Sequence, residues 1–292
     1  MPTRTVDQGF RTFLSTLTPT AGESTAAKNH RSSIKSCLES NFGMTNFFRT
    51  GSFGNGTSIS GYSDVDYFAE IPTCNLKENS TTTLSQVRDA LKKRFPTTNV
   101  RVSCPAVVVP FGTDAKESTE VTPADYIKTT DDEYRVYDIP DCSDGWMRSS
   151  PDAHNAYVRE IDENLSKKVK PLIRFIKAWK YYRNVPISSF YLELRVTEYA
   201  EDESWISYAA DVKGVLSHLD DIDLRRMQDP KGISGYISPC STDAKLEDAK
   251  SKLSTALTRA QNACEAEDKG NTKTAFEWWD MLYNYNFPSY YY

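Results

Sequence analysis

The segment that most constrains the fold is a Gly/Ser-rich stretch running directly into an alternating apolar and polar run. Residues 51–61 read GSFGNGTSISG, and residues 63–71 read SDVDYFAEI. The glycines favour a loop or a helix start, and the alternation predicts a strand after it. Side chains two positions apart on a strand point to the same face, so Asp64 and Asp66 are held together. The fold must therefore contain a sheet that presents two neighbouring carboxylates.

Two like charges held this close cost free energy and raise their pKa values, and a hard divalent cation such as Mg²⁺ is the usual compensation. Taken alone, a D-x-D strand is also compatible with the solvated face of an edge strand. The glycines of residues 51–61 let the backbone approach an anion closely, which suits a nucleoside triphosphate beside a metal pair. A flexible linker is the alternative, but Phe53 and Ile59 within the stretch weaken it.

Length and composition predict a globular protein of about two lobes. The 292 residues are 39% apolar and 12% aromatic, and 35 basic against 40 acidic residues give a net charge of −5. This sign disfavours wrapping of duplex nucleic acid, so a polyanionic ligand requires a local basic patch. The cysteines and histidines show no C-x-x-C pair, which argues against a zinc site or a disulfide framework. They are Cys37, Cys74, Cys104, Cys142, Cys240, Cys264, His30, His154 and His218.

The start of the chain carries Arg4, Asp7 and Arg11 and lacks the apolar centre of a signal peptide. Nowhere does an uncharged apolar run approach the ~18 residues of a membrane span. We therefore expect a soluble protein of a reducing cytoplasm.

Periodicity divides the chain into a lobe that contains strands, residues 1–150, and a helical lobe, residues 151–292. In the first lobe we expect helices at 7–17, 22–42 and 82–95, and strands at 63–71, 100–111 and 119–123, with the last two strands joined by a turn that contains Gly112 and Asp114. In the second lobe we expect helices at 151–182, 188–200, 204–219 and 242–267.

A basic segment lies at residues 165–183, LSKKVKPLIRFIKAWKYYR, which contains no acidic residue. At helical spacing Lys170, Arg174 and Lys177 share one face, while Val169, Leu172, Ile173 and Ile176 fall on another face that can enter a core. Pro171 is tolerated if Ser166 caps the helix. The basic face could contact phosphate, or it could simply be solvated.

These residues resemble a known family. GS followed by D-V-D is similar to the signature of the DNA polymerase β-like nucleotidyltransferases, which take a third acidic ligand from a later strand. T119-E-V-T-P-A124 resembles that strand in the oligoadenylate synthetase and cGAS-like branch, which places Glu120 in the third position. The family usually has Asp there, and Asp114 and Asp125 are alternatives.

The resemblance continues into the basic segment and beyond it. L-I-R-F-I-K-A-W-K is similar to the helix that supplies a lysine to the donor triphosphate, and the match falls on Lys177. In I187-S-S-F-Y-L-E-L194, Ser189 would contact phosphate and Phe190 would stack on a base, with Tyr191 as the alternative. The segments Asp229–Gly232, Pro239-Cys240, Trp278-Trp279 and Phe287-Pro288 look like the closing segments of the bacterial cGAS-like cyclic oligonucleotide synthases, the CD-NTases.

The resemblance covers the chain from about Phe10 to Pro288 and implies an α+β fold. A polymerase-β-like nucleotidyltransferase lobe with a mixed sheet would face an α-helical lobe, with the active site in the cleft between them. Asp64, Asp66 and Glu120 would be catalytic and would hold two Mg²⁺ ions, which Mn²⁺ could replace. Nucleotide binding would fall to Gly51, Ser52, Lys177, Ser189 and Phe190.

The expected function is a Mg²⁺-dependent synthase that makes a cyclic dinucleotide such as cGAMP from ATP and GTP, with release of pyrophosphate, in bacterial antiphage (CBASS) signalling. The product would act on a separate effector protein, and the enzyme would be a monomer with nucleic acid only as an activator. One alternative is a linear, template-independent nucleotidyltransferase that makes oligoadenylate or extends RNA. Others are a degenerate nucleotide-binding scaffold and a nucleic-acid-binding module built on Lys170, Arg174 and Lys177.

Overall fold

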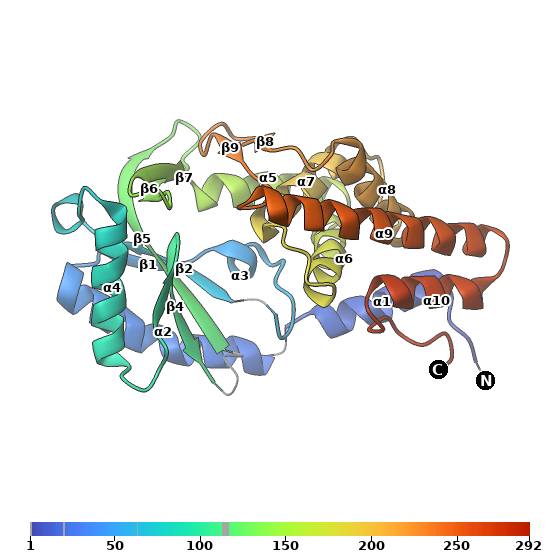
Figure 1. Cartoon of the computed structure of the whole chain (residues 1–292), viewed down its shortest axis with the longest axis horizontal. Helices are drawn as coiled ribbons and strands as arrows, with labels where there is room; N and C mark the ends of the chain where they lie inside the picture. The colour runs from blue at the N-terminus through green and yellow to red at the C-terminus, as the bar shows by residue number, and fades with distance from the viewer. Residues whose placement is uncertain (1, 20, 63, 113–116) are drawn as a thin grey trace. The chain divides into compact units, whose positions relative to one another are not determined.

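A mixed seven-stranded sheet and a group of helices make up most of the chain in the computed structural model (Figure 1), which describes residues 2–19, 21–62, 64–112 and 117–292. The residues fall into two units. The sheet unit comprises residues 19–156 and 231–235, and the helical unit comprises residues 1–18, 157–230 and 236–292. The expected α+β fold with a mixed sheet is confirmed.

The sheet is mixed because one of its pairings is parallel. The order β1-β2-β5-β4-β3 contains a parallel β2–β5 pair, the other pairs being antiparallel, and β6 and β7 continue from the far half of β5. The parallel pair joins two strands distant in sequence, and the crossover between them includes a helix, as parallel pairing requires. The strands are β1 (Asn46–Arg49), β2 (Val65–Glu70), β3 (Arg101–Ser103), β4 (Ala106–Phe111), β5 (Glu117–Thr129), β6 (Arg135–Pro140) and β7 (Trp146–Ser149).

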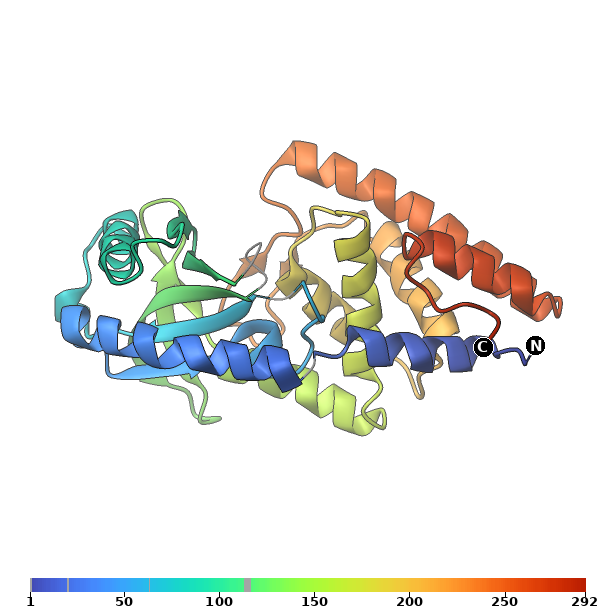
Figure 2. The same ribbon diagram turned by 90° about the horizontal axis from the view of Figure 1, so that it is seen from below.

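Alternation along β2 decides which of its residues enter the core. Val65, Tyr67 and Ala69 are buried in one cluster with residues of α2 (Ala21–Phe42) and α4 (Ser80–Arg94), and Figures 1 and 2 show both helices beside the strands. The neighbouring positions, Asp66 among them, therefore point to the opposite face. The short helices α3 (Gly51–Asn55) and η1 (Thr73–Asn75) flank this strand in sequence.

The helical unit is built around aromatic side chains of segments far apart in sequence. Phe10 of α1 is fully buried, and its ring lies 5.0 Å from the rings of Phe175 and Trp279 and 5.1 Å from that of Phe287. The helices are α1 (Val6–Leu17), α6 (Val169–Tyr182), α7 (Ser189–Glu201), α8 (Tyr208–Asp221), α9 (Asp243–Asp268) and α10 (Thr272–Leu282), together with most of α5 (Pro151–Asn164) and the hairpin of β8 (Met227–Gln228) and β9 (Tyr236–Ile237).

The first residues of the chain also bind its last ones. The Arg4 guanidinium donates to the carbonyls of Ser289 and Tyr291, at 2.6 and 2.7 Å, and lies 4.0 Å from the centre of the Tyr292 ring. Thr3 forms a β-bridge with Tyr291. Residues 1–18 therefore group with the C-terminal helices, whereas the predicted division at residue 150 assigns them to the lobe with the sheet.

Several element boundaries differ from the sequence predictions. The single strand expected at 100–111 is an antiparallel pair, because the chain turns at Cys104–Pro105 between β3 and β4. The strands β1, β6 and β7 and the helix α10 were not expected. The turn residue Asp114 lies outside the described residues.

The helix expected over 151–182 is two helices. Ser166 and Lys167 adopt left-handed backbone conformations, with φ of 57° and 61°, and interrupt it. Lys168 occupies the N-cap position of α6 without a side-chain cap hydrogen bond, so Ser166 does not cap this helix, contrary to the expectation from the sequence. Pro171 is the third residue of α6, a position with no internal partner for an N–H group.

The argument against disulfide pairing is also wrong for one pair of cysteines. Cys104, at the β3–β4 turn, is bonded to Cys142, in the loop between β6 and β7, and the two Cα atoms are 5.6 Å apart. The spacing of 38 residues carried no local signal of this pairing, because the sheet topology brings the two turns together. The remaining cysteines, Cys37, Cys74, Cys240 and Cys264, are free.

Replacement of Phe10 by Ala should destabilise the helical unit strongly. It removes a fully buried ring that contacts α6 and α10, and such truncations cost about 3–5 kcal/mol. Denaturant titration followed by tryptophan fluorescence measures the loss. Arg11→Ala is the control, since this side chain is 74% exposed, and an equal effect of both substitutions would contradict the role given to α1.

Candidate functional site

Three carboxylates gather on the face of the sheet opposite to α2 and α4. Because β2 and β5 are parallel, Asp66 is the direct register partner of Glu120, and the side chains of paired residues share a face. Asp64 precedes Asp66 by two positions, and its charge acts on Glu120. The structure thus brings together the three acids that the sequence singled out.

Glu120 is the acid of this cluster whose ionised form is destabilised by its surroundings. Burial and, to a smaller extent, the charge of neighbouring Asp64 together raise the pKa of Glu120 to about 7, while Arg101 opposes the shift. Arg101 pairs with Val108 on the strand next to Glu120. Sequence reasoning missed Arg101, because only the β3–β4 pairing brings it to this face.

Glu120 and its alternative Asp125 both lie on β5, but on opposite faces of it. Asp125 lies five positions after Glu120 on β5 and therefore faces the other side of a regular strand. Its carboxylate accepts a hydrogen bond from the Thr73 hydroxyl at 2.8 Å. This placement favours Glu120 over Asp125, and Asp114 lies outside the described residues.

Gly51 lies directly against Asp66. The Thr50 N–H donates to the Asp66 carbonyl at 2.8 Å, and Gly51, with φ of +56°, begins α3 immediately after it. A Cβ atom at residue 51 would stand 2.6 Å from the Asp66 Cγ, so glycine is required by both backbone conformation and space. Ser52, the second residue of α3, is half-buried next to this contact.

Lys177, on α6 of the helical unit, is not a solvated cation. Its side chain is fully buried, and its Nζ lies 3.8 Å from Glu193 Oε2 of α7. A phosphate at Lys177 must therefore share the ammonium with Glu193 or displace it. Sequence reasoning missed Glu193, because the two residues lie 16 positions apart on different helices and only the α6–α7 packing joins them.

The start of α7 carries the other nucleotide-binding candidates. Ser188 caps this helix, and the Ser189 hydroxyl lies 3.2 Å from the Tyr181 hydroxyl. The Phe190 side chain is 38% exposed, whereas Tyr191 is fully buried and donates its hydroxyl to the Arg225 carbonyl at 2.7 Å. Phe190 is accordingly the partly exposed ring of the two, and Tyr191 belongs to the core.

The basic helix does not present the outward-facing row of cations that a nucleic-acid-binding module needs. Lys177 is buried, and burial lowers the pKa of Arg174. The apolar face is as expected, since Val169, Leu172, Ile173 and Ile176 are buried. These positions favour a helix packed in the core of its unit over an exposed nucleic-acid-binding surface.

The donor chemistry of the acidic cluster fits a hard divalent cation. Its three carboxylates supply the oxygen ligands that Mg²⁺ prefers, and a cation would relieve the repulsion between Asp64 and Glu120. Among the described residues, no three acidic, His or Cys side chains stand close enough to hold an ion as they are oriented. Occupancy would therefore need a change of side-chain rotamer, with the backbone positions already set by β2 and β5.

None of the described helices has both the length and the hydropathy required to span a bilayer.

Gly51→Ala should weaken metal binding at the acidic cluster about tenfold or more, because the added methyl group displaces the Asp66 carboxylate. Titration of Mn²⁺ followed by electron paramagnetic resonance measures the affinity. Gly56→Ala is the matched control, since Gly56 also has a positive φ of 73° but open space around its Cα. Equal affinities in the two variants would refute the contact.

Glu120→Gln should change how stability depends on pH in the metal-free protein. The pKa of Glu120 is raised to about 7 in the folded chain, so its favourable contribution is complete below about pH 4.5 and is lost as the pH rises through 7. We expect the variant to exceed the parent in unfolding free energy by on the order of 2 kcal/mol at pH 8. Near pH 4.5 the two should be similar.

Urea titrations in EDTA at both pH values measure this difference. Asp125→Asn, on the other face of the same strand, is the control. A parallel pH dependence of parent and Glu120→Gln would show that Glu120 is not buried beside Asp64.

The chain is similar to proteins of a known family. Residues 4–162 match the SMODS family, described as Second Messenger Oligonucleotide or Dinucleotide Synthetase domain. A "Probable cyclic nucleotide synthase" of Bacillus cereus (strain VD146) is 29% identical over 154 residues, which are 52% of this chain and 46% of that protein. The match thus spans about half the length of this curated relative.

Solved structures share the fold at low sequence identity. The structure of E. coli MS115-1 CdnC with ATP has a TM-score of 0.74 and 15% identity, covering 97% of this chain and 98% of that one. Vibrio cholerae DncV cyclic AMP-GMP synthase with a linear intermediate has a TM-score of 0.66 and 16% identity, covering 85% and 71%. The chain therefore belongs to the SMODS family of nucleotidyltransferase domains, as the resemblance to the CD-NTases predicted.

Proposed function

We propose that this protein is a metal-dependent nucleotidyltransferase that makes a cyclic dinucleotide. The observation that carries the proposal is the parallel β2–β5 register, which pairs Asp66 with Glu120. Asp64 lies close enough for its charge to raise the pKa of Glu120. Carboxylates grouped on one face beside a glycine that touches one of them are suited to binding metal and phosphate together. The family match supports the same chemistry.

In this proposal Asp64, Asp66 and Glu120 hold two Mg²⁺ ions, or Mn²⁺ in their place. Bound there, the metal would make the attacking ribose hydroxyl more acidic and neutralise the departing pyrophosphate. Glu120 must ionise to serve as a ligand, so we expect metal binding to the metal-free protein to strengthen as the pH rises through about 7. The close Gly51 backbone keeps the Asp66 carboxylate in place.

The remaining residues bind and orient the nucleotide. Gly51 and Ser52 would lie along the phosphates, the Ser189 hydroxyl would donate to phosphate, and the exposed Phe190 ring would stack on a base. Such stacking is worth ~1–3 kcal/mol and accepts any base. We assign Lys177 to the triphosphate through its buried pair with Glu193, which limits how far the ammonium can move.

We further propose that ATP and GTP are the substrates, that the product is a cGAMP-like ring, and that the monomeric, cytoplasmic enzyme signals to a separate effector protein in CBASS antiphage defence. The DncV structure contains a linear pppApG intermediate, which is support from a protein of the same fold. The runner-up is a linear nucleotidyltransferase, which would use the same residues.

The double variant Asp64→Asn with Asp66→Asn should lose nucleotidyl transfer almost completely, because it removes two charged metal ligands from three. Incubation with each labelled NTP and with mixtures, followed by mass spectrometry, measures turnover and identifies the bases. Asp125→Asn is the control and should retain activity. Unchanged turnover in the double variant would refute the catalytic role of these aspartates and favour a degenerate nucleotide-binding scaffold.

Treatment of the products with phosphatase separates the two enzyme activities. A cyclic product has no terminal phosphate and resists digestion. Complete digestion would therefore refute cyclisation and support the linear nucleotidyltransferase.

A further inference from the structure

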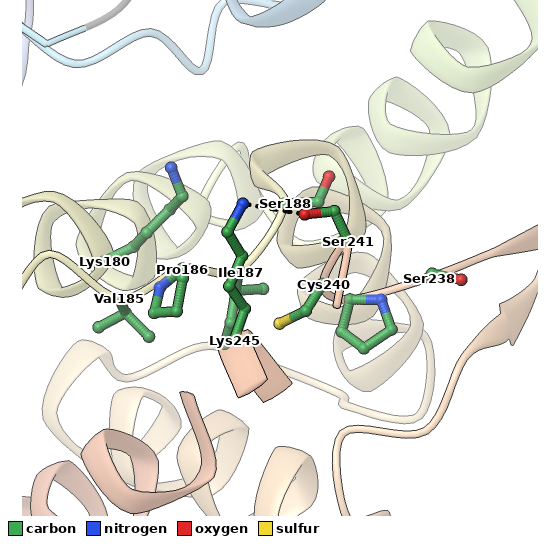
Figure 3. A pocket seen from close by; sticks show the side chains of 10 residues that line it. Lys180, Val185, Pro186, Ile187, Ser188, Ser238, Cys240, Ser241 and Lys245 are labelled. Atoms are coloured by element: carbon green, nitrogen blue, oxygen red, sulfur yellow. Dashed lines mark hydrogen bonds between the residues drawn. The ribbon is translucent and has the colours of Figure 1, made fainter. Parts of the chain in front are cut away.

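A solvent-open pocket of about 490 Å³ lies entirely within the helical unit, outside the residues assigned so far (Figure 3). It forms where the end of α6, the loop before α7 and the loop before α9 meet. Its volume is in the range typical of small-molecule sites. The lining residues are Lys180, Val185, Pro186, Ile187, Ser188, Ser238, Pro239, Cys240, Ser241 and Lys245.

The pocket is positively charged. Lys180 and Lys245 line it, and no acidic residue does. Figure 3 shows the two ammonium groups on the same side of the pocket as the Ser188 and Ser241 hydroxyls. The protein as a whole carries a net charge of −5, so this concentration of positive charge is local.

Lys245 differs from its neighbours on α9. Lys250 and Lys252 form ion pairs with Asp223 and Asp248, at 2.8 and 2.7 Å. In the part of the chain that the structure describes, Lys245 Nζ instead donates to Ser241 Oγ at 2.9 Å and has no carboxylate within ion-pair distance. Its charge is therefore available to an anion in the pocket.

The pocket is connected to Ser189, one of the proposed phosphate contacts. Lys180 Nζ lies 4.2 Å from the centre of the Tyr181 ring, and the Tyr181 hydroxyl lies 3.2 Å from the Ser189 hydroxyl. The Ser188 N–H donates to the Pro239 carbonyl at 2.7 Å and fixes the two loops to each other. Buried Val185 and Ile187 form an apolar wall, which strengthens the attraction between charges beside it.

We propose that this pocket binds a polyphosphate, with Lys180 and Lys245 as its charged ligands and the serine hydroxyls as additional donors. Lysine is a compact point charge that suits phosphate oxygens. This inference rests on the proposed function for the source of the anion, which is either released pyrophosphate or the triphosphate tail of a nucleotide.

Isothermal titration of the intact protein with pyrophosphate in EDTA tests the binding directly, because it requires neither metal nor turnover. We expect Lys180→Gln and Lys245→Gln each to weaken binding on the order of tenfold, the loss of one charge-assisted contact. Lys252→Gln, on the same helix but outside the pocket, is the matched control and should bind as the parent does. A parallel titration with ATP distinguishes the nucleotide tail from the free anion.

Cys240 reports where the anion binds. This thiol lines the pocket and is partly exposed, so labelling with N-ethylmaleimide near neutral pH, where the reagent is selective for thiols, is suitable. Saturating pyrophosphate or ATP should slow labelling of Cys240 several-fold but leave exposed Cys74 unchanged.

Binding of neither probe, or binding that survives both lysine substitutions, would overturn the assignment. These outcomes are independent of the activity of the Asp64→Asn, Asp66→Asn variant, so the pocket and the proposed function can fail separately.

Discussion

The parallel pairing of β2 with β5 is the constraint on which the candidate site depends. A shift by one residue would turn Glu120 to the face that packs against α2 and α4 and bring Val121 out of the core, since strand side chains alternate. The apolar residues Val65, Tyr67 and Val121 therefore hold the acids in place indirectly. Burial of the hydrophobic face selects the register, and the register puts three carboxylates at one location despite their repulsion.

That repulsion remains visible in the folded protein. The pKa of Glu120 rises to about 7 because the carboxyl is buried beside Asp64, with Arg101 as a partial compensation. The backbone of Gly51 closes the other side of Asp66. Stability in this region is thus lower at neutral and higher pH than the packing alone would give, and a bound cation would reverse this loss. Grouping these carboxylates therefore lowers the folding stability of the metal-free protein.

The sequence predicted the parts of this arrangement that depend on local pattern. The alternation around Asp64 and Asp66 predicted the strand that begins at Val65, and the motif resemblance placed Glu120 as the third acid with Asp114 and Asp125 as alternatives. Glu120 and Asp125 lie on opposite faces of β5, and this favours Glu120. Long-range pairings could not be read in the same way. Burial of Lys177 with Glu193, the Cys104–Cys142 bond and the approach of Arg101 to Glu120 arise from contacts between segments that carry no local signal of one another.

The grouping of residues 1–18 with residues 236–292 makes the sheet unit an insertion within the helical unit. During synthesis the sheet strands would leave the ribosome together and could pair early. Phe10, in contrast, must wait for Trp279 and Phe287 before its ring is enclosed. Until then the first helix exposes an apolar stripe with Phe10, Phe13 and Leu17. A nascent chain would therefore pass through a stage in which one unit is formed and the other still needs protection from aggregation.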